Sequence, residues 1–187
     1  MPDTVPCTDP TLPPPELIPA WERHPEIVKI GDPVLLAKAA PVKRADASLS
    51  RLLAELRRLM VKADGVGLAA PQIGVSLRAL VYDSGDGIRA LVNPRIASYR
   101  GEQLEPMEGC LSIPGLRGTV KRAMEIRVKA LDDHGRPITV RAEDFEARVI
   151  QHEMDHLDGI LFIERAEPGT LVWLTGVGED HEESPEE

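Results

Sequence analysis

The chain reads His152-Glu153-Met154-Asp155-His156 near the end of an amphipathic stretch. Residues four apart lie one turn above each other on the same face of a helix. His152 and His156 can therefore both present an imidazole nitrogen to a single metal ion. Glu153 can then act as a general base toward a water molecule held by that ion. The stretch indicates a metal-dependent hydrolase and leaves open which bond is cut.

The composition fits one globular domain with short extensions. Of the 187 residues, 42% are hydrophobic and 28% are charged. The net charge of -9 arises at the two ends, because residues 1–20 and 179–187 contain acids and no Lys or Arg, whereas residues 21–178 are neutral. Aromatic residues make up only 3%, and no basic stripe is evident. We therefore expect no direct binding of nucleic acid.

The cellular location is predicted from what the chain lacks. Its beginning is acidic and rich in proline, unlike a secretory signal. No apolar run is long enough to cross a bilayer, so no membrane association is expected. The two cysteines, Cys7 and Cys110, are far apart and do not suggest a disulfide framework. These features predict a cytoplasmic protein with reduced thiols.

The distribution of proline and charge divides the chain into three predicted regions. Residues 1–20 contain seven prolines and predict a flexible, poorly packed N-terminal arm. Residues 178–187 predict a disordered acidic tail. The catalytic domain is expected between them, over residues 21–177.

Hydrophobic periodicity within this domain predicts two helices and two β-hairpins. A leucine stripe favours a helix over residues 48–63, capped by Asp46 or Ser48 and stopped at Gly65. Apolar runs that flank turn residues favour strand pairs. The expected segments are hairpins over 77–93 and 124–141 and a second helix over 143–157. This order predicts an α+β fold in which antiparallel β-sheets surround a central metal-binding helix.

A catalytic metal site of this kind commonly has three protein ligands and one open position. Downstream of the histidines, Glu164 and Glu167 are candidates for the third ligand. Upstream, Cys110 stands in the polar segment 108–112, predicted as a loop, and a thiolate is a good soft ligand. The residue types alone leave this choice open. For Asp155, a hydrogen bond to a ligand histidine is as compatible with the sequence as a solvent-facing role or a helix-surface ion pair.

The glycine-rich stretch 65–74 has the spacing of a dinucleotide-binding fingerprint, but its context contradicts that function. The fingerprint should follow a strand and open a helix. Here it follows a predicted helix, and Pro71 opposes a helix after it. The stretch is better interpreted as a loop that exposes its backbone. Its one amide side chain, Gln72, is suited to bind a peptide or an oxyanion.

Three segments together resemble the motifs of the peptide deformylase family, in the family's order. Residues 65–72 read Gly-Val-Gly-Leu-Ala-Ala-Pro-Gln, residues 108–112 read Glu-Gly-Cys-Leu-Ser, and residues 151–156 read Gln-His-Glu-Met-Asp-His. The second motif beside the third is highly specific. The resemblance extends over residues 26–165.

This resemblance implies the chemistry of each site residue. The metal ligands would be Cys110, His152 and His156. Glu153 would be the general acid/base toward a metal-bound water that attacks the formyl carbon. Gln72 and the backbone amide of Leu111 would stabilise the oxyanion. The substrate-binding residues would be Val66, Gly67 and Gly109 along the peptide, with Phe145, Arg148 and Val149 at the methionine pocket.

The resemblance also implies the substrate, the cofactor and the setting. Members remove the formyl group from N-terminal formylmethionine of nascent polypeptides and release formate. One divalent ion is expected, Fe²⁺ natively with Zn²⁺ or Ni²⁺ as substitutes. The protein is expected to be a monomer that meets its substrates at the ribosome. Two other functions remain to be excluded: a metalloprotease that cuts internal peptide bonds, and a non-catalytic binding module with the same fold.

Overall fold

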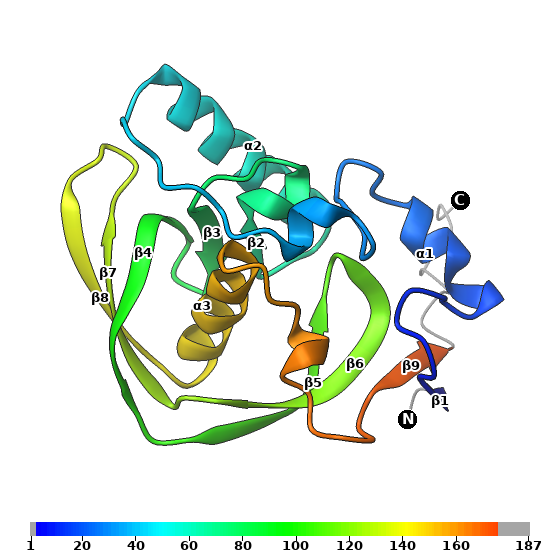
Figure 1. Cartoon of the computed structure of the whole chain (residues 1–187). Coiled ribbons are helices and arrows are strands. Elements are labelled where there is room, and N and C mark those ends of the chain that lie inside the picture. The colour runs from blue at the N-terminus through cyan, green and yellow to red at the C-terminus, as the bar shows by residue number, and fades with distance from the viewer. Residues whose placement is uncertain (1–2, 176–187) are drawn as a thin grey trace, which may run out of the picture.

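The structure is a computed structural model that describes residues 3–175. It confirms the predicted α+β class, with helix α3 (Asp144–Leu157) at the centre of two antiparallel sheets (Figure 1). The acidic tail predicted over residues 178–187 lies outside the described residues. Among the residues described, no helix combines the length and the apolar character needed to span a membrane.

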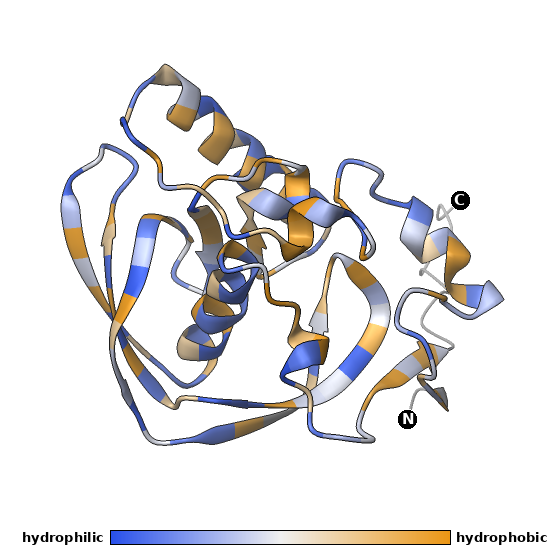
Figure 2. Ribbon diagram, in the orientation of Figure 1, coloured by the Kyte–Doolittle hydropathy of each residue, from blue (hydrophilic) through white to orange (hydrophobic). Residues whose placement is uncertain are grey.

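The larger sheet has the strand order β2-β3-β4-β7-β8, and each neighbouring pair is antiparallel. Its strands are β2 (Gly67–Ala69), β3 (Ala79–Asp83), β4 (Ile88–Arg100), β7 (Glu125–Leu131) and β8 (Pro137–Glu143). The predicted hairpins are confirmed as the pairs β3–β4 and β7–β8. Hydrophobic and hydrophilic residues alternate along β7 and β8, as expected for strands with one face on the core (Figure 2).

The smaller sheet has the order β1-β9-β6-β5 and is also antiparallel. Its strands are β1 (Asp3–Pro6), β5 (Gln103–Cys110), β6 (Ile113–Arg122) and β9 (Val172–Thr175). The remaining elements are α1 (Ile18–Glu22), α2 (Ala47–Lys62) and the short 3-10 helices η1 (Pro15–Leu17), η2 (Pro33–Leu36), η3 (Ala70–Ile73) and η4 (Phe162–Glu164).

Strand β3 is buried on both faces because α2 and α3 cover opposite sides of the larger sheet. Successive side chains of a strand point to opposite faces. Leu80 and Tyr82 accordingly pack in the cluster that contains the buried face of α3, whereas Ala79 and Val81 pack with α2. This two-sided burial explains the continuous apolar run in the sequence and fixes α3 against the sheet.

Helix α2 begins and packs as its sequence predicts. Of the two possible caps, Asp46 is the one observed, since its carboxylate accepts hydrogen bonds from the backbone N–H groups of Ser48 (2.8 Å) and Leu49 (3.2 Å). This satisfies donors that the first helical turn leaves without partners. The leucine stripe is buried against the sheet, with Leu53 and Leu56 at most 1% exposed.

Helix α3 ends where the glycine after it permits a left-handed turn. Gly159 has a φ of +74°, a conformation that other residues adopt at a cost. A Cβ atom there would also lie 2.6 Å from the carbonyl oxygen of Leu36. The turn at Gly159 returns the chain toward η4. His156, the second histidine of the motif, lies in the last turn of α3 and is buried.

The described part of the N-terminal segment is packed, which differs from the expectation of a flexible, poorly packed arm. Strand β1 pairs with β9, from Asp3 opposite Thr175 to Pro6 opposite Val172. Leu17 is 4% exposed in a core cluster with residues of β6 and β9. The partners of this segment lie at the far end of the chain, so its proline content alone did not predict them.

Candidate active site

Helix α3 carries both histidines of the motif and the glutamate between them into the protein interior. His152, Glu153 and His156 are 9%, 3% and 1% exposed. The two imidazole rings lie edge to face, with centroids 5.0 Å apart. The four-residue spacing thus places both rings on one face of the helix, as predicted.

Cys110 reaches the same point from the end of β5. Its Sγ atom lies 3.2 Å from Nε2 of His156, and one potential ligand atom from each of Cys110, His152 and His156 lies within 4.8 Å of the others. The prediction that Cys110 stands in a polar loop was wrong, because residues 108–110 belong to a strand paired with β6. The alternative third ligand Glu164 instead accepts a hydrogen bond from the Leu161 backbone (2.8 Å).

The protonation of the cluster suits a metal ion. Burial alone would raise the pKa of the Cys110 thiol, but the nearby imidazoles of His156 and His152 lower it well below its ordinary value. One thiolate and two imidazoles form a donor set that borderline-soft divalent ions accept. Nε2 of His156 is the ring nitrogen that faces Cys110, and Oε2 of Glu153 is buried without a hydrogen-bond partner among the described residues. These residues therefore fit a metal ion with a water molecule beside it.

Glu153 lies next to the cluster without belonging to it. Burial raises the pKa of its carboxyl to about 7, despite the opposing effect of the two histidines. A carboxyl with a pKa near neutrality can both accept and return a proton. Its position and its pKa suit a group that exchanges a proton beside the cluster.

Glu108 is a site residue that the sequence reasoning missed. Its Oε1 atom lies 2.8 Å from Nδ1 of His152. A carboxylate at that distance holds the proton on Nδ1 and leaves the Nε2 lone pair for a metal. In the sequence, the only indication of a role for Glu108 was its place in the motif of residues 108–112, because its partners His152 and Arg122 lie further along the chain.

Arg122 and Asp155 hold Glu108 in place. Arg122 donates to the Glu108 carboxylate through Nε (3.0 Å) and Nη2, and through Nη1 to Asp155 (2.6 Å). Burial alone would raise the pKa of Glu108, but the hydrogen bonds from His152 and Arg122 lower it to about 2. Asp155 also pairs with Arg165 (2.6 Å). Of the roles left open for Asp155, the structure shows the ion pair. This ion pair is buried, whereas the sequence suggested one on the helix surface.

Replacing Glu108 tests this support. We expect Glu108→Gln to lower metal affinity or activity by about 10–100-fold, the usual effect of removing a partner of a ligand histidine. The buried Arg122 loses one of its two carboxylate partners and keeps Asp155, so the loss of stability should be smaller than the about 3–5 kcal/mol that an uncompensated buried charge costs. Metal titration and thermal unfolding measure the two effects. The matched control is Glu102→Gln, an exposed acid 3.4 Å from Lys121, which should change neither; equal effects in both variants would contradict the assigned role.

Gln72 presents its amide nitrogen to the cluster. Its Oε1 atom accepts a hydrogen bond from the Ala69 backbone (2.8 Å), which fixes the side chain. Its Nε2 atom then lies 3.5 Å from Sγ of Cys110 and 3.3 Å from Oγ of Ser112. The predicted loop around it is instead strand β2 followed by η3. The amide group of Gln72 is buried and its Nε2 atom points toward Cys110, an arrangement that suits a donor to an oxyanion.

The cluster opens into a cleft of about 680 Å³ between β2 and β5. Both strands end their sheets, so each has one edge without a partner strand among the described residues. All the predicted site residues except His156 line this cleft: Val66, Gly67, Gln72, Gly109, Cys110, Leu111, Phe145, Arg148, Val149, His152 and Glu153. His156 lies behind Cys110. An extended peptide between the two open edges would pass directly over the cluster.

Gly67 allows β2 to approach the carboxylate of Glu153 closely. A Cβ atom at this position would lie 2.4 Å from Oε1 of Glu153. We expect Gly67→Ala to displace Glu153 and to lower kcat/KM by about 10²-fold, the effect of moving a catalytic group by about 1 Å. Steady-state kinetics measure the loss. Gly85→Ala is the control for a methyl added away from the cleft: it meets no atom within 4 Å, and the strain of a φ of +109° stays within its own turn. Normal activity of Gly67→Ala would contradict the close approach.

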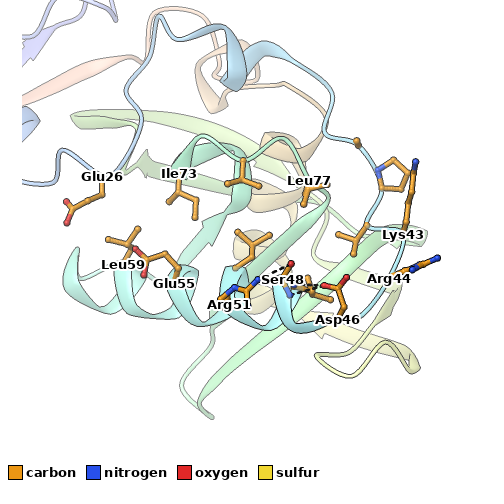
Figure 3. Close-up of a pocket in the computed structure, with 16 residues that line it drawn as sticks. Glu26, Lys43, Arg44, Asp46, Ser48, Arg51, Glu55, Leu59, Ile73 and Leu77 are labelled. Carbon is orange, nitrogen blue, oxygen red and sulfur yellow. Dashed lines mark hydrogen bonds between the residues drawn. The ribbon is translucent and has the colours of Figure 1, made fainter.

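A second hollow, of about 1030 Å³, lies between α2 and the segments around residues 42 and 75 (Figure 3). Its floor is apolar, with Leu49, Leu59 and Leu77 among its residues. The group of Cys and His that could hold a metal lies elsewhere. The chemistry of the chain therefore belongs to the cleft between β2 and β5.

Comparisons with known proteins identify the family of this chain. The family model described as polypeptide deformylase matches residues 24–171. The peptide deformylase of Carboxydothermus hydrogenoformans is 48% identical over 142 residues, which are 76% of this chain and 93% of that protein. The crystal structure of a peptide deformylase from Legionella pneumophila has a TM-score of 0.73 at 44% identity and covers 77% of this chain and 86% of its own. A peptide deformylase from Synechococcus elongatus, solved in complex with actinonin, has a TM-score of 0.73 at 42% identity, with 77% and 80% covered. The chain therefore belongs to the polypeptide deformylase family.

Proposed function

We propose that the cleft between β2 and β5 removes the formyl group from the N-terminal formylmethionine of nascent polypeptides and releases formate. The observation that carries the proposal is the buried cluster of Cys110, His152 and His156 with Glu153 beside it. Membership in the deformylase family assigns the formyl amide as the bond that is cut. A protease that uses a third histidine or a glutamate as ligand has no need of this thiolate.

The metal ligands in this proposal are Cys110, His152 and His156. The ion is Fe²⁺ natively, with Zn²⁺ or Ni²⁺ able to replace it. When bound, it supplies a Lewis acid that makes a water molecule acidic enough to ionise near neutral pH. The donor set supports a divalent ion of this group, since thiolate and imidazole both suit it.

Glu153 moves the proton. Its carboxylate accepts a proton from the attacking water, and it returns that proton to the amine nitrogen of methionine as the formyl carbon–nitrogen bond breaks. The raised pKa of Glu153, about 7 because of burial, suits both halves of this exchange. The amine then leaves as the free N-terminus of the peptide.

Backbone and amide donors stabilise the charge and hold the substrate. Nε2 of Gln72 and the backbone N–H of Leu111 donate to the oxygen on which negative charge develops. The peptide backbone pairs with the open edge of β2 at Val66 and Gly67, as an added strand, with Gly109 on the opposite wall. Both edges line the cleft, which supports this placement.

The methionine side chain is placed against α3. Val149 is 6% exposed, whereas Phe145 is 43% exposed at the mouth of the cleft. The guanidinium of Arg148 lies 5.5 Å from the centroid of the Phe145 ring. This contact turns the polar end of Arg148 along the ring and leaves the aliphatic part of the helix face for the substrate.

The last part of the proposal concerns the catalytic unit and where it acts. The catalytic unit is residues 21–177, acting as a monomer in the cytoplasm on chains that emerge from the ribosome. A substrate defined by the N-terminus of a nascent polypeptide supports action at the ribosome.

Formate release tests the function. Protein purified without oxygen should release formate from formyl-Met-Ala-Ser and should leave acetyl-Met-Ala-Ser and the unblocked peptide intact. Actinonin, which is bound in the Synechococcus elongatus structure, should stop the release. Cleavage of the unblocked peptide would support a protease instead, and a protein without metal and without formate release would support a binding module.

A further inference from the structure

We propose that the second hollow, which lies along α2, binds an amphiphile with a long alkyl chain and an anionic head, namely a free long-chain carboxylate. This site is separate from the cleft between β2 and β5 and takes no part in the proposed reaction. It combines an apolar floor, a wall whose backbone groups are already bonded, and three cations without acidic partners: Lys43, Arg44 and Arg51.

The floor of the hollow is an apolar stripe of α2 that extends beyond its contact with the sheet. Leu49, Leu52 and Leu59 follow one another at helical spacing and line the hollow. Leu52 is only half-buried, and so are Val42 and Val75, which face it from the surrounding segments. Aliphatic side chains that remain partly exposed in one concave surface gain free energy when an apolar ligand covers them.

The size and shape of the hollow suit a small ligand. Its volume of about 1030 Å³ is at the upper end of the roughly 300–1,000 Å³ found for small-molecule sites, which are mostly apolar with a few polar groups that orient the ligand. Figure 3 shows that the hollow extends along α2, from Glu26 and Leu59 at one end to Lys43 and Arg44 at the other. An elongated apolar floor with charged groups at its end fits an alkyl chain with one polar head.

The wall around residues 40–42 does not favour an extended peptide. The backbone N–H of Ala40 donates to the carbonyl of Ser76 (3.0 Å), and its carbonyl accepts from Arg78 (2.8 Å). The N–H and carbonyl of Val42 both bond to the side-chain amide of Asn93, at 2.8 Å each. An extended peptide along this wall would leave its own backbone groups without partners, which costs free energy. An alkyl chain carries no such groups.

The acids that line the hollow are already engaged. Glu26 lies 2.6 Å from Nζ of Lys62, and Glu55 lies 2.6 Å from Nη2 of Arg58. Neither of these two cations lines the hollow. Asp46 is the third acid, and its carboxylate caps α2. The acids therefore contribute little free negative charge to the hollow.

The cations that line the hollow are available to a ligand. Lys43 and Arg44 are exposed at the end where α2 begins, and Arg51 follows one turn into the helix. None of the three has an ion pair within the part of the chain that the structure describes. Arg51 donates to the hydroxyl of Ser48 (3.1 Å). Cations at one end of an apolar surface complement a ligand whose anionic head lies at one end of its chain.

Three probes test the class of ligand: dodecanoate, octanoate and dodecyltrimethylammonium. Calorimetric titration of the metal-loaded full chain at low salt should give dodecanoate an affinity about tenfold or more above that of octanoate, since a fully buried methylene strengthens binding by about fourfold. The cationic probe of equal length should bind about tenfold more weakly than dodecanoate, and high salt should reduce this difference. Equal affinities of the two twelve-carbon probes, or no binding of dodecanoate, would overturn the inference.

Charge reversal locates the head of the ligand. The double variant Lys43→Glu/Arg44→Glu should weaken dodecanoate binding about tenfold and strengthen binding of the cationic probe. Arg127 and Lys129 are exposed on β7 and do not line the hollow. Arg127→Glu/Lys129→Glu makes the same change in net charge and should leave both affinities unchanged. An equal loss in the two double variants would reduce the effect to net charge and would overturn the assignment.

Leu52→Gln locates the alkyl chain. This change places an amide on the floor of the hollow and should weaken dodecanoate binding severalfold. Val61→Gln is the matched control, because Val61 is 64% exposed on the same helix and does not line the hollow. Thermal unfolding checks that both variants remain folded. Unchanged binding to Leu52→Gln would place the carboxylate elsewhere, for example on the metal, and would overturn the inference.

Two other occupants of the hollow give different results. A second copy of the chain would appear in light scattering as a dimer that Leu52→Gln dissociates. A membrane surface would appear as sedimentation with phosphatidylglycerol vesicles in the absence of any binding of free dodecanoate. We expect neither result, and either one would overturn the assignment of the hollow to a free carboxylate.

Discussion

Replacing Glu153 by alanine should lower kcat by about 10²–10⁴-fold while the protein keeps its metal, because a general acid/base contributes that much to rate. Glu153 is adjacent to a ligand in sequence but is not among the three residues whose ligand atoms converge. Its role is to carry a proton, so Glu153→Gln, which preserves its size, should lose activity to a similar extent. Metal analysis and formate release on the same sample measure both quantities.

The control for this prediction lies on the same segment. Glu143 is an exposed acid at the start of α3, and its side chain makes no capping hydrogen bond. Glu143→Ala should keep both metal and turnover. If Glu153→Ala lost the metal together with its activity, Glu153 would be a ligand rather than a base, and the assignment would have to change.

Replacing Cys110 by serine should remove the metal. A hydroxyl is far less acidic than a thiol and does not offer the anionic sulfur that the two imidazoles stabilise in the native site. Loss of a direct ligand should lower metal affinity by more than the roughly 10–100-fold expected for a residue that only supports one. Activity should fall with it and return in part when excess metal is supplied.

The chain offers a matched control for this variant. Cys7 is its other cysteine, half-buried, and it belongs neither to the residues that line the cleft nor to the three whose ligand atoms converge. Cys7→Ser should keep full metal and full activity. Full metal and full activity in Cys110→Ser would show that the proposed ligand set is wrong.

The parts of the fold that were predicted from the sequence depend on local patterns. Helices α2 and α3 carry continuous apolar stripes, each is followed by a glycine within three residues of its end, and both were predicted to within one residue at each end. The pairs β3–β4 and β7–β8 are joined by short turns rich in Gly and Asp. In each case the residues that form the element also provide its signal, so periodicity was sufficient.

The parts that were missed depend on contacts between distant residues. Strand β2 and the end of β5 contain glycines and polar residues that favour loops, and they become strands because β3 and β6 pair with them. The N-terminal segment is ordered by β9, at the far end of the described chain. Propensity is a weak guide where tertiary pairing decides the conformation.

In the candidate site, too, local patterns predicted some residues, and contacts between distant residues determine the others. His152, Glu153 and His156 follow from helix geometry, whereas the place of Cys110 followed only from resemblance to a family. The role of Glu108 depends on its distance from His152 on another element, which no local pattern encodes.

The most direct test of the central claim is a metal titration of the metal-free protein, with formate release from formyl-Met-Ala-Ser measured at each point without oxygen. The account predicts no release without metal and a linear rise with added Fe²⁺ that stops at one ion per chain. Release by the metal-free protein, or a rise unaffected by Cys110→Ser, would contradict a reaction that depends on a metal held by Cys110, His152 and His156.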